Sequence, residues 1–480
     1  MLVYLPCRGV QYINNLGKKM SKPRIDYRNK NILAPMVKAG TLPLRLLALR
    51  YGADLVYCEE LIDWKLLRSV RRENALLGTV DFIDESDGSV VFRTCDSEKS
   101  RVVLQLGTCN ADRALQVAKK LENDVAAIDI NMGCPKEFSL KGGMGAALLT
   151  QPEKVKNIIT TLVKGCTLPI TAKIRLLPKP EDTLAFCKML QACGVAAIGV
   201  HGRTKEQRPR HANNNEAIAA LAKELDVPVI ANGGSKEIET HEDIDKFRVA
   251  CGVNSVMLAR VALWNVSIFR KEGALPLDEV IVEYLKLAVQ YDSSVGNTKY
   301  CVQSMLRELQ ESPRGKLFLA AQSVQGICSL WGLGDFCSKM QEERRNACNG
   351  VGEEKPETIE GERMAKRRKH EHIEVVSSDV TALPVVFQRG IYVNRDAELP
   401  KTRLLMWSRQ NNFKQPVYTT TQVEKLFCSV IEVDNVKYSS SYWEKNKRFA
   451  EQGAALAALI ILGLEPKEKA LKDGSLLSSD

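Results

Sequence analysis

Apolar residues between positions 30 and 260 follow two alternating patterns. Short, nearly continuous apolar runs occur at 31–35, 54–58, 102–106, 126–131, 169–175, 196–201, 228–234 and 254–260. Longer segments separate these runs, and in 111–122 the apolar residues recur at mostly helical spacing. Continuous apolar runs are typical of strands in a parallel sheet whose two faces are both covered. The pattern therefore predicts parallel strands joined by crossover helices.

Eight such strands, each followed by a helix within about 250 residues, match the (β/α)8 arrangement. We therefore predict an α/β protein with a TIM barrel over residues 28–275. An open doubly wound sheet is the alternative, although it would usually have fewer strands.

Polar residues and glycines, with a few of their immediate neighbours, gather where the predicted strands end. They are Pro35, Met36, Glu59, Glu60, Gln105, Asn131, Cys134, Lys173, Arg175, His201, Arg203, Asn232, Gly233, Gly234, Ala259 and Arg260. Each alone has a structural explanation, because glycine often forms turns after strands and a lysine there is often solvated. Active sites of TIM barrels lie at the C-terminal ends of the strands. Convergence of so many sites on one barrel opening therefore predicts an active site.

Two strand ends suggest a bound phosphate. Small residues at 232–234 and 259–260 would leave backbone N–H groups free to bind a phosphate. A helix-like segment, whose N-terminus could bind the same phosphate, follows residues 259–260. Arg203 and Arg260 could add charge-assisted hydrogen bonds, while Lys173 would face a ring and stabilise a reduced flavin. No Rossmann or P-loop glycine pattern lies at a strand-to-helix turn. We therefore predict FMN as the cofactor.

Cys134 follows a buried strand, and Gly142, Gly143 and Gly145 come shortly afterwards. The thiol could be inert and buried, a nucleophile, or a proton donor. A nucleophile needs a nearby base and a lowered pKa, and no local pairing with histidine is apparent. A proton donor needs only a thiol that stays protonated at neutral pH. We therefore predict that Cys134 is a general acid under a glycine-rich loop that can move.

Nine motifs stand in the order typical of one family of RNA-modifying enzymes. They are LAPMV (33–37), CEE (58–60), QLG (105–107), DINMGCP (129–135), KGGMGAALL (141–149), KIR (173–175), HGRT (201–204), ANGG (231–234) and LAR (258–260). The chain resembles the tRNA-dihydrouridine synthases, and in particular the eukaryotic cytosolic branch with an appended double-stranded-RNA-binding domain. The resemblance covers roughly residues 28–465.

The resemblance implies an FMN enzyme that reduces the 5,6 double bond of uridine in the tRNA D-loop, at about position 20, with NADPH as electron donor. It also implies that Cys134 donates a proton to C5 while hydride from the flavin reaches C6. The implied cofactor-binding residues are Pro35, Met36, Val37, Gln105, Lys173, His201, Asn232, Gly233, Gly234, Ala259 and Arg260.

Residues 276–345 are predicted to be helical, either as a domain that helps to hold tRNA or as a structural bundle. Arg307, Arg314 and Lys316 are candidate phosphate contacts. The charged segment 346–380 reads as a linker. Its basic block, Lys366, Arg367, Arg368 and Lys369, could be an RNA-binding arm, a nuclear signal or a solvated run.

Residues 381–465 show the helix–strand–strand–strand–helix order of a double-stranded-RNA-binding domain, followed by a tail at 466–480. Lys445, Lys447 and Arg448 would meet phosphates at a helix N-terminus, and Gln410 is a minor-groove candidate. The usual glycine-proline-x-histidine loop is replaced by TQVE (421–424), and Glu451 stands at a usual lysine position. We therefore expect this module to need the basic arm, or to make protein contacts as well.

Length, charge and cysteine content limit the number of domains, the class of partner and the cellular location that we expect. The 480 residues suggest two or three domains, and the net charge of +10 favours a polyanionic partner. No apolar run reaches the roughly 18 residues of a membrane helix. Fourteen cysteines without a CxxC pair and five histidines argue against disulfides and a metal site. We expect a cytoplasmic monomer, with a mitochondrial fraction possible because the extension 1–27 is basic and a nuclear fraction possible because of the basic block at 366–369.

Two other functional classes remain open. One is a different FMN barrel that reduces a small molecule, such as a dihydroorotate dehydrogenase. The other is a non-catalytic RNA-binding or regulatory protein built on a flavin barrel.

Overall fold

The computed structural model describes residues 25–85, 88–321, 323–350, 379–388, 399–423, 426–444 and 446–477. Two compact units divide the chain, Met1–Gly352 and Glu353–Asp480. No helix among the described residues is long and apolar enough to cross a membrane.

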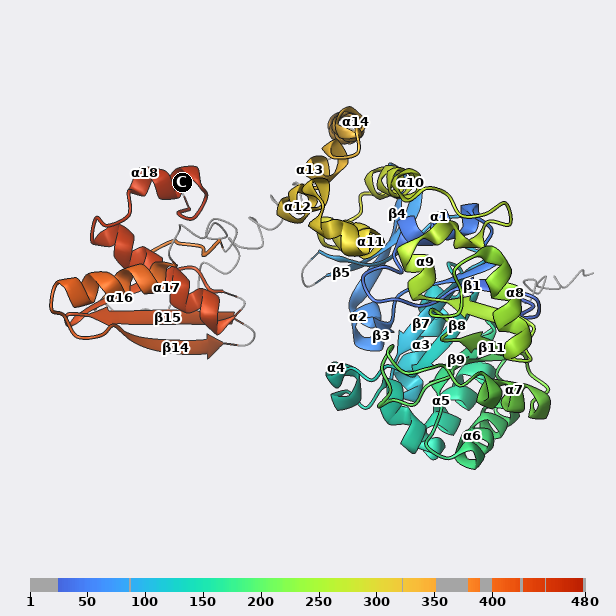
Figure 1. Ribbon diagram of the computed structural model, residues 1–480. Coiled ribbons are helices and arrows are strands. Elements are labelled where there is room, and N and C mark those ends of the chain that lie inside the picture. Colours follow the sequence, from blue (N-terminus) through green and yellow to red (C-terminus); the bar gives the residue numbers. More distant parts are fainter. Residues whose placement is uncertain are drawn as a thin grey trace, which may run out of the picture. The chain divides into compact units, whose positions relative to one another are not determined.

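The first unit is built on a closed barrel of eight parallel strands (Figure 1). They are β1 (Asn31–Leu33), β2 (Leu55–Tyr57), β7 (Val102–Gly107), β8 (Ala127–Met132), β9 (Ile170–Arg175), β10 (Ala197–His201), β11 (Val229–Asn232) and β12 (Ser255–Leu258). β1 pairs with both β2 and β12, and pairing of β2 with β7 closes the ring. The predicted TIM barrel is confirmed, and each predicted strand is present.

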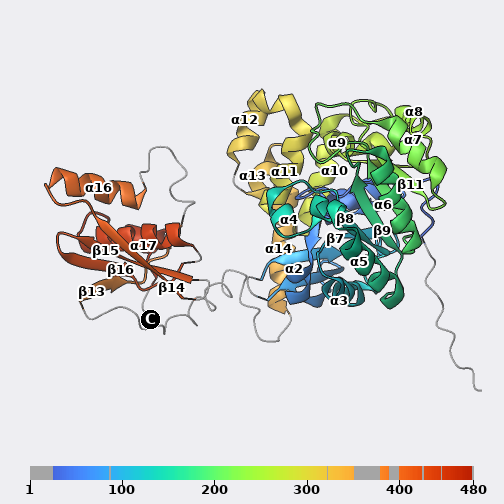
Figure 2. The same cartoon turned by 90° about the horizontal axis from the view of Figure 1, so that it is seen from below.

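Helices cover the outside of the barrel (Figure 2). They are α1 (Leu42–Arg50), α3 (Ala111–Leu121), α5 (Pro152–Gly165), α6 (Pro180–Ala192), α7 (Asn215–Glu224) and α8 (His241–Ala250). α3 begins where the Asn110 side chain accepts a hydrogen bond from Arg113 N, a typical N-cap. Its buried face carries Ala114, Val117 and Leu121, whose spacing follows the helical period.

A three-stranded antiparallel sheet lies between β2 and β7 in the sequence, where only a crossover helix was expected. It consists of β4 (Ser69–Asn74), β5 (Thr79–Asp84) and β6 (Val90–Thr94), and it follows β3 (Leu61–Ile62) and α2 (Asp63–Arg68). Arg93 and Asp81 form an ion pair at 2.6 Å between β6 and β5. Charged residues that pair across strands hide the apolar pattern that sequence reading depends on.

Five helices follow the barrel within the same unit. They are α10 (Leu277–Gln290), α11 (Val295–Leu306), α12 (Pro313–Ala320), α13 (Val324–Ser329) and α14 (Gly334–Gly350). α10 packs on α1, and α11 packs on α9 (Arg260–Trp264). Buried Tyr284, Cys301 and Phe318 join these helices to the barrel core. The predicted helical segment is therefore continuous in packing with the barrel.

The second unit is a four-stranded sheet covered by helices. Its strands are β13 (Val380–Leu383), β14 (Val417–Val423), β15 (Leu426–Val433) and β16 (Val436–Ser440), and its helices are α16 (Pro400–Gln410), α17 (Lys447–Ile461) and α18 (Lys467–Lys472). The predicted order of helix, three strands and helix is confirmed by α16, β14–β16 and α17. β13 adds a parallel edge to β16.

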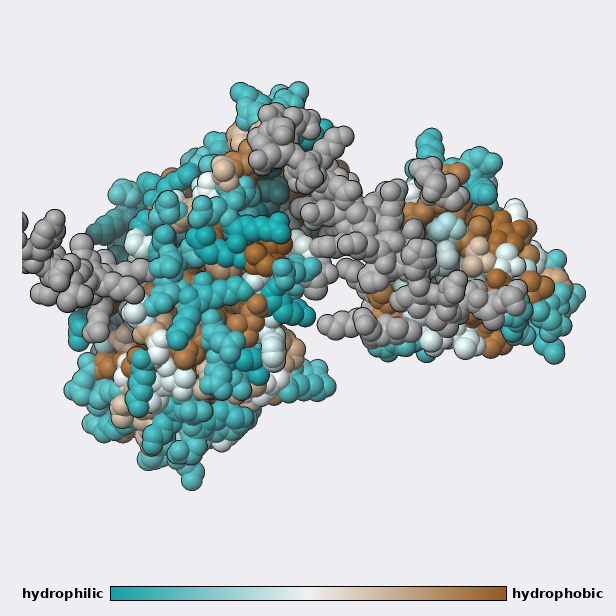
Figure 3. All heavy atoms as spheres, turned by 180° about the vertical axis from the view of Figure 1, so that it is seen from behind, coloured by the Kyte–Doolittle hydropathy of each residue, from teal (hydrophilic) through white to brown (hydrophobic). Residues whose placement is uncertain are grey.

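Small side chains let α17 lie close to the sheet. Ala454, Ala455 and Ala458 are fully buried against Ile431 and Tyr438. On the face seen in Figure 3, this unit carries clear apolar areas, whereas the visible face of the first unit is mostly hydrophilic.

Candidate active site

The C-terminal ends of the barrel strands bring most of the predicted residues to one opening. Strand pairing places Lys173 beside Asn131, and His201 beside Asn232. Lys173 Nζ donates a hydrogen bond to Asn232 Oδ1 at 3.0 Å, and Asn232 Nδ2 donates to Met257 O at 2.8 Å. The lysine is thus held inside the barrel opening by the neighbouring strands.

A chain of amide groups connects the barrel interior to the Cys134 loop. Gln105 Nε2 donates to Asp129 Oδ2 at 2.8 Å, and Asn131 Nδ2 donates to Gln105 Oε1 at 3.0 Å. Asn131 Oδ1 accepts from the backbone N–H groups of Gly133 and Cys134, at 2.9 and 3.0 Å. Burial raises the pKa of Asp129 to about 6. Gln105 therefore supports the loop that carries Cys134, besides being a predicted cofactor contact.

Several cations gather at the opening, where Asp129 and Glu60 are the nearby carboxyl groups. Burial and the charge of Arg175 together lower the pKa of Lys173 to about 8. The pKa of Arg175 falls to about 10 through burial and the charges of Arg208 and Arg203. Burial and four cations also depress the pKa of His201, which is neutral at pH 7. A bound anion would relieve this repulsion, so the site fits a phosphate-bearing ligand.

The loop after β11 is shaped by close packing. Gly233 has φ +129°, and a Cβ there would collide with Asn213 and approach Arg203 Nη1 to 3.1 Å. Asn213 Oδ1 is buried and has no hydrogen-bond partner among the described residues.

Arg203 differs from its sequence interpretation. The side chain is 1% exposed, and its guanidinium donates to His211 O and Gly233 O, both at 3.0 Å. It also lies 3.1 Å from His201 Nε2. Protein groups therefore occupy much of its hydrogen-bonding capacity. Arg260, at the start of α9, is partly exposed, packs over Trp264 and remains the more accessible cation.

Pro35, Met36 and Val37 form the half-buried turn after β1. Met36 O accepts hydrogen bonds from Ala39 N and Gly40 N, at 3.1 and 2.7 Å. Ala259 joins β12 to α9 and is also partly buried. These positions line the same end of the barrel as Lys173.

The glycine-rich segment folds back onto Cys134. Ala146 N donates to Cys134 O at 3.0 Å, and Gly145 has φ +58°. A Cβ at Gly145 would lie 2.7 Å from Cys134 O, so only glycine allows this approach. Burial raises the pKa of the Cys134 thiol, and the charge of Glu60 raises it further. The thiol is therefore protonated at neutral pH, as a general acid requires.

Sequence reasoning missed three contributors. Asp129 was detectable as a lone charge within an apolar strand, whereas Ser139 and Asn213 gave no signal because their roles depend on loop packing. No cluster of metal-ligating side chains occurs within the described residues.

Candidate RNA contacts in the second unit are exposed. Lys447 and Arg448 lie in the first turn of α17, after Asn446, whose side chain accepts from Phe449 N at 2.9 Å. Gln410 ends α16 and is exposed. Glu451 forms an ion pair with Lys401 at 2.5 Å. Lys366, Arg367, Arg368, Lys369 and Lys445 lie outside the described residues.

In the helical segment, Arg307 and Lys316 are exposed. Arg314 instead pairs with Asp278 at 2.6 Å, which weakens its case as a phosphate contact.

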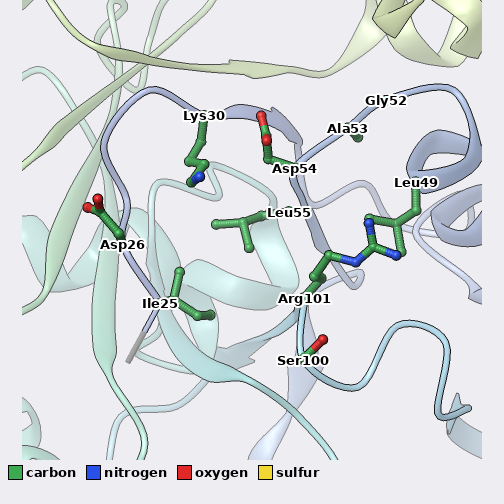
Figure 4. Close-up of a pocket in the computed structure, with 10 residues that line it drawn as sticks. All are labelled: Ile25, Asp26, Lys30, Leu49, Gly52, Ala53, Asp54, Leu55, Ser100 and Arg101. Carbon is green, nitrogen blue, oxygen red and sulfur yellow. The ribbon is translucent and has the colours of Figure 1, made fainter. Parts of the chain in front are cut away.

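A separate hollow lies at the opposite end of the barrel (Figure 4). It is lined by Asp26, Lys30, Asp54 and Arg101, which precede β1, β2 and β7. None of the predicted site residues lies there, and the N-terminal ends of barrel strands serve stability rather than chemistry.

Comparison with known proteins identifies the family. Residues 32–330 match the model of the family described as "Dihydrouridine synthase (Dus)". The chain belongs to this family. The dihydrouridine synthase membership expected from the motifs is therefore confirmed.

Two yeast proteins and one solved domain illustrate the similarity. The chain is 40% identical over 294 residues to tRNA-dihydrouridine(20) synthase [NAD(P)+] of Schizosaccharomyces pombe, covering 59% of this chain and 60% of that protein. It is 37% identical over 300 residues to the Saccharomyces cerevisiae protein of the same name, covering 59% and 78%. A crystal structure titled tRNA-dihydrouridine(20) synthase dsRBD domain is 40% identical, covering 18% of this chain and 94% of that one, with a TM-score of 0.18.

Proposed function

We propose that this dihydrouridine synthase reduces uridine to dihydrouridine in the D-loop of tRNA, at about position 20, with FMN as bound cofactor and NADPH as electron donor. The observation that carries the proposal is the placement of Cys134, whose backbone N–H is held by Asn131, at a barrel opening where Lys173, Arg175 and Arg203 gather. Both yeast relatives are named as position-20 synthases that use NAD(P)+.

The residues at the opening fit FMN. Asn232, Gly233, Gly234, Ala259 and Arg260 would hold the phosphate, because they combine a glycine cradle with an accessible cation. Lys173, His201 and Gln105 would contact the ring, and Pro35–Val37 would form its edge. When bound, FMN supplies the hydride that reduces the pyrimidine.

Cys134 would act as the general acid. Its Sγ carries the proton that is delivered to C5 of the pyrimidine, and the S–H bond breaks as the C–H bond forms. Asn131 fixes the backbone at Cys134, and Gly145 lets the glycine-rich segment approach the cysteine closely.

The substrate uridine must leave the stacked tRNA to reach this opening, and unstacking costs least in a loop. Exposed Lys447 and Arg448 of the second unit, together with the basic block 366–369, would supply salt-dependent attraction to phosphates. We propose that the protein acts as a cytoplasmic monomer on tRNA.

The test is reconstitution with purified full-length protein. We expect a yellow protein with flavin absorbance, and NADPH-dependent dihydrouridine at position 20 of unmodified tRNA transcripts, mapped by reverse transcription after borohydride treatment. A colourless protein would favour the non-catalytic alternative. Flavin reduction by NADPH without any dihydrouridine would favour a small-molecule reductase.

A further inference from the structure

The carboxyl group of Glu60 lies against the Cys134 loop in a confined space. Glu60 follows β2, and its Oε1 accepts a hydrogen bond from Ser139 Oγ at 3.4 Å. Its Oε2 is buried and makes no hydrogen bond within the described part of the chain. Gly107, at the end of β7, leaves room for the carboxyl, because a Cβ there would lie 2.9 Å from Glu60 Oε1.

Gly145 brings the carboxyl, a hydroxyl and the thiol to one place. A Cβ on Gly145 would collide with Ser139 Oγ and lie 3.0 Å from Cys134 Cβ. Ser139 is fully buried at the centre of α4 (Glu137–Lys141), directly beside the loop. The same glycine that closes the loop therefore holds Ser139 between Glu60 and Cys134.

Charges of both signs act on the Cys134 thiol. Lys173 and Arg175 favour its thiolate form, and the backbone N–H of Lys136 and the hydroxyl of Ser139 act in the same direction. Glu60 is the carboxylate that opposes them, while Asp129 is engaged by Gln105 and Thr171. Lys136 in turn favours the ionised form of Glu60, against the effect of burial. Burial is the largest influence that raises the pKa of the thiol, and removal of Glu60 would lower that pKa because the cations would then act unopposed.

We propose that Glu60 is a positioning residue for the general acid: held by Ser139, its carboxylate opposes Lys173 and Arg175 and keeps Cys134 protonated. This inference rests on the proposed function, in which Cys134 must carry a proton when the substrate arrives. It acts at alkaline pH, where the carboxyl and Arg175 are charged and the thiol begins to ionise, while Lys173 contributes only below about pH 8, where it is protonated. Glu60 thus moves the alkaline limit of the reaction to higher pH.

The first experiment measures the thiol directly. In the full-length flavoprotein, iodoacetamide labelling of the Cys134 peptide is followed by mass spectrometry between pH 6 and 10. We expect Glu60→Gln to label about fivefold faster than wild type near pH 8, the ratio that corresponds to about 1 kcal/mol of lost repulsion. Glu137→Gln is the matched control, because Glu137 is an exposed carboxyl of the same loop.

The second experiment measures the pH dependence of dihydrouridine formation. The alkaline limb of the Glu60→Gln profile should move to lower pH by the same amount as the labelling curve, with near-wild-type rates at pH 6.5. Glu60→Asp should move it back towards wild type. Should Glu60→Gln fail to fold, Glu60→Asp provides a second variant with a smaller shift in the same direction, because it keeps the charge but withdraws it from the thiol.

Two results would overturn the proposal. One is an unchanged labelling curve in Glu60→Gln, and the other is a rate loss of equal size at every pH, which indicates only structural damage. Failure of the proposed function looks different: wild type would form no dihydrouridine, while the labelling curves would still report the interaction between Glu60 and Cys134.

Discussion

The barrel opening and the first turn of α17 both carry cations, but the two regions hold them in different ways. At the opening, Lys173 and Arg203 are largely or fully enclosed, and burial lowers the pKa of each. At α17, Lys447 and Arg448 project into solvent. Burying charge is costly unless a partner compensates, so the enclosed cations suit one specific anion. Exposed cations cost little and attract any polyanion in a salt-dependent manner.

The largest expected effect is on the rate of the reaction at the barrel opening. Cys134→Ala should lower dihydrouridine formation by about 10²–10⁴-fold, the usual contribution of a general acid, while flavin absorbance is retained. Single-turnover assays with tRNA and prereduced protein measure this rate. Near-normal turnover in the variant would remove the acid role from Cys134, and loss of the flavin would make the assay uninformative about catalysis.

The next prediction compares an enclosed ion pair with an exposed one. Arg45 and Glu98 pair at 2.6 Å in the first unit, with side chains 2% and 0% exposed. Arg45→Met leaves a buried carboxylate without its partner and should destabilise this unit by about 3–5 kcal/mol, measured by urea unfolding. Asp379→Asn, which removes the exposed partner of Lys437 in the second unit, should produce no measurable change. Equal effects would contradict the comparison.

A third prediction concerns the pKa of Lys173, which burial lowers to about 8. The charged form predominates below that pH and is lost above it. Affinity of the flavin-free protein for FMN should therefore fall roughly tenfold between pH 7 and pH 9, the value of one charge-assisted hydrogen bond. Quenching of FMN fluorescence measures it. In Lys173→Met the pH dependence should disappear, and its persistence would assign the effect to another group.

The smallest expected effect is the loss of tRNA affinity when the exposed cations of α17 are removed. Changing both Lys447 and Arg448 to alanine should weaken tRNA binding about threefold at physiological salt and reduce the slope of log Kd against log salt by about 2. NADPH-driven flavin reduction should be unchanged, because the two residues belong to the second unit. A truncated chain that ends at residue 352 lacks the whole second unit, so its loss of tRNA affinity gives the largest contribution that this unit can make. If that chain bound tRNA as well as the full protein, the second unit would have another role.

Whether the sequence predicted a helix or strand depended on how that element is buried in the fold. Strands β8 and β9 are buried on both faces, so their sequences are nearly continuous apolar runs that predicted strands correctly. The sheet β4–β6 escaped detection because Arg93 and Asp81 satisfy each other across it, which makes both strands look polar. The order of helices and strands in the second unit could be predicted because the alanines of α17 recur at helical spacing and the three strands are short β-rich runs.

The same division holds within the candidate active site. Cys134, Lys173, His201 and Arg260 were found because they stand at strand ends, and all strand ends of a parallel barrel meet at one opening. By itself, then, the sequence determined the barrel, its active end and the family. Only the tertiary structure decided that Arg203 is enclosed by protein acceptors and that Glu60 lies beside Cys134. Those relations depend on loop packing between residues far apart in the chain, and no local period encodes such packing.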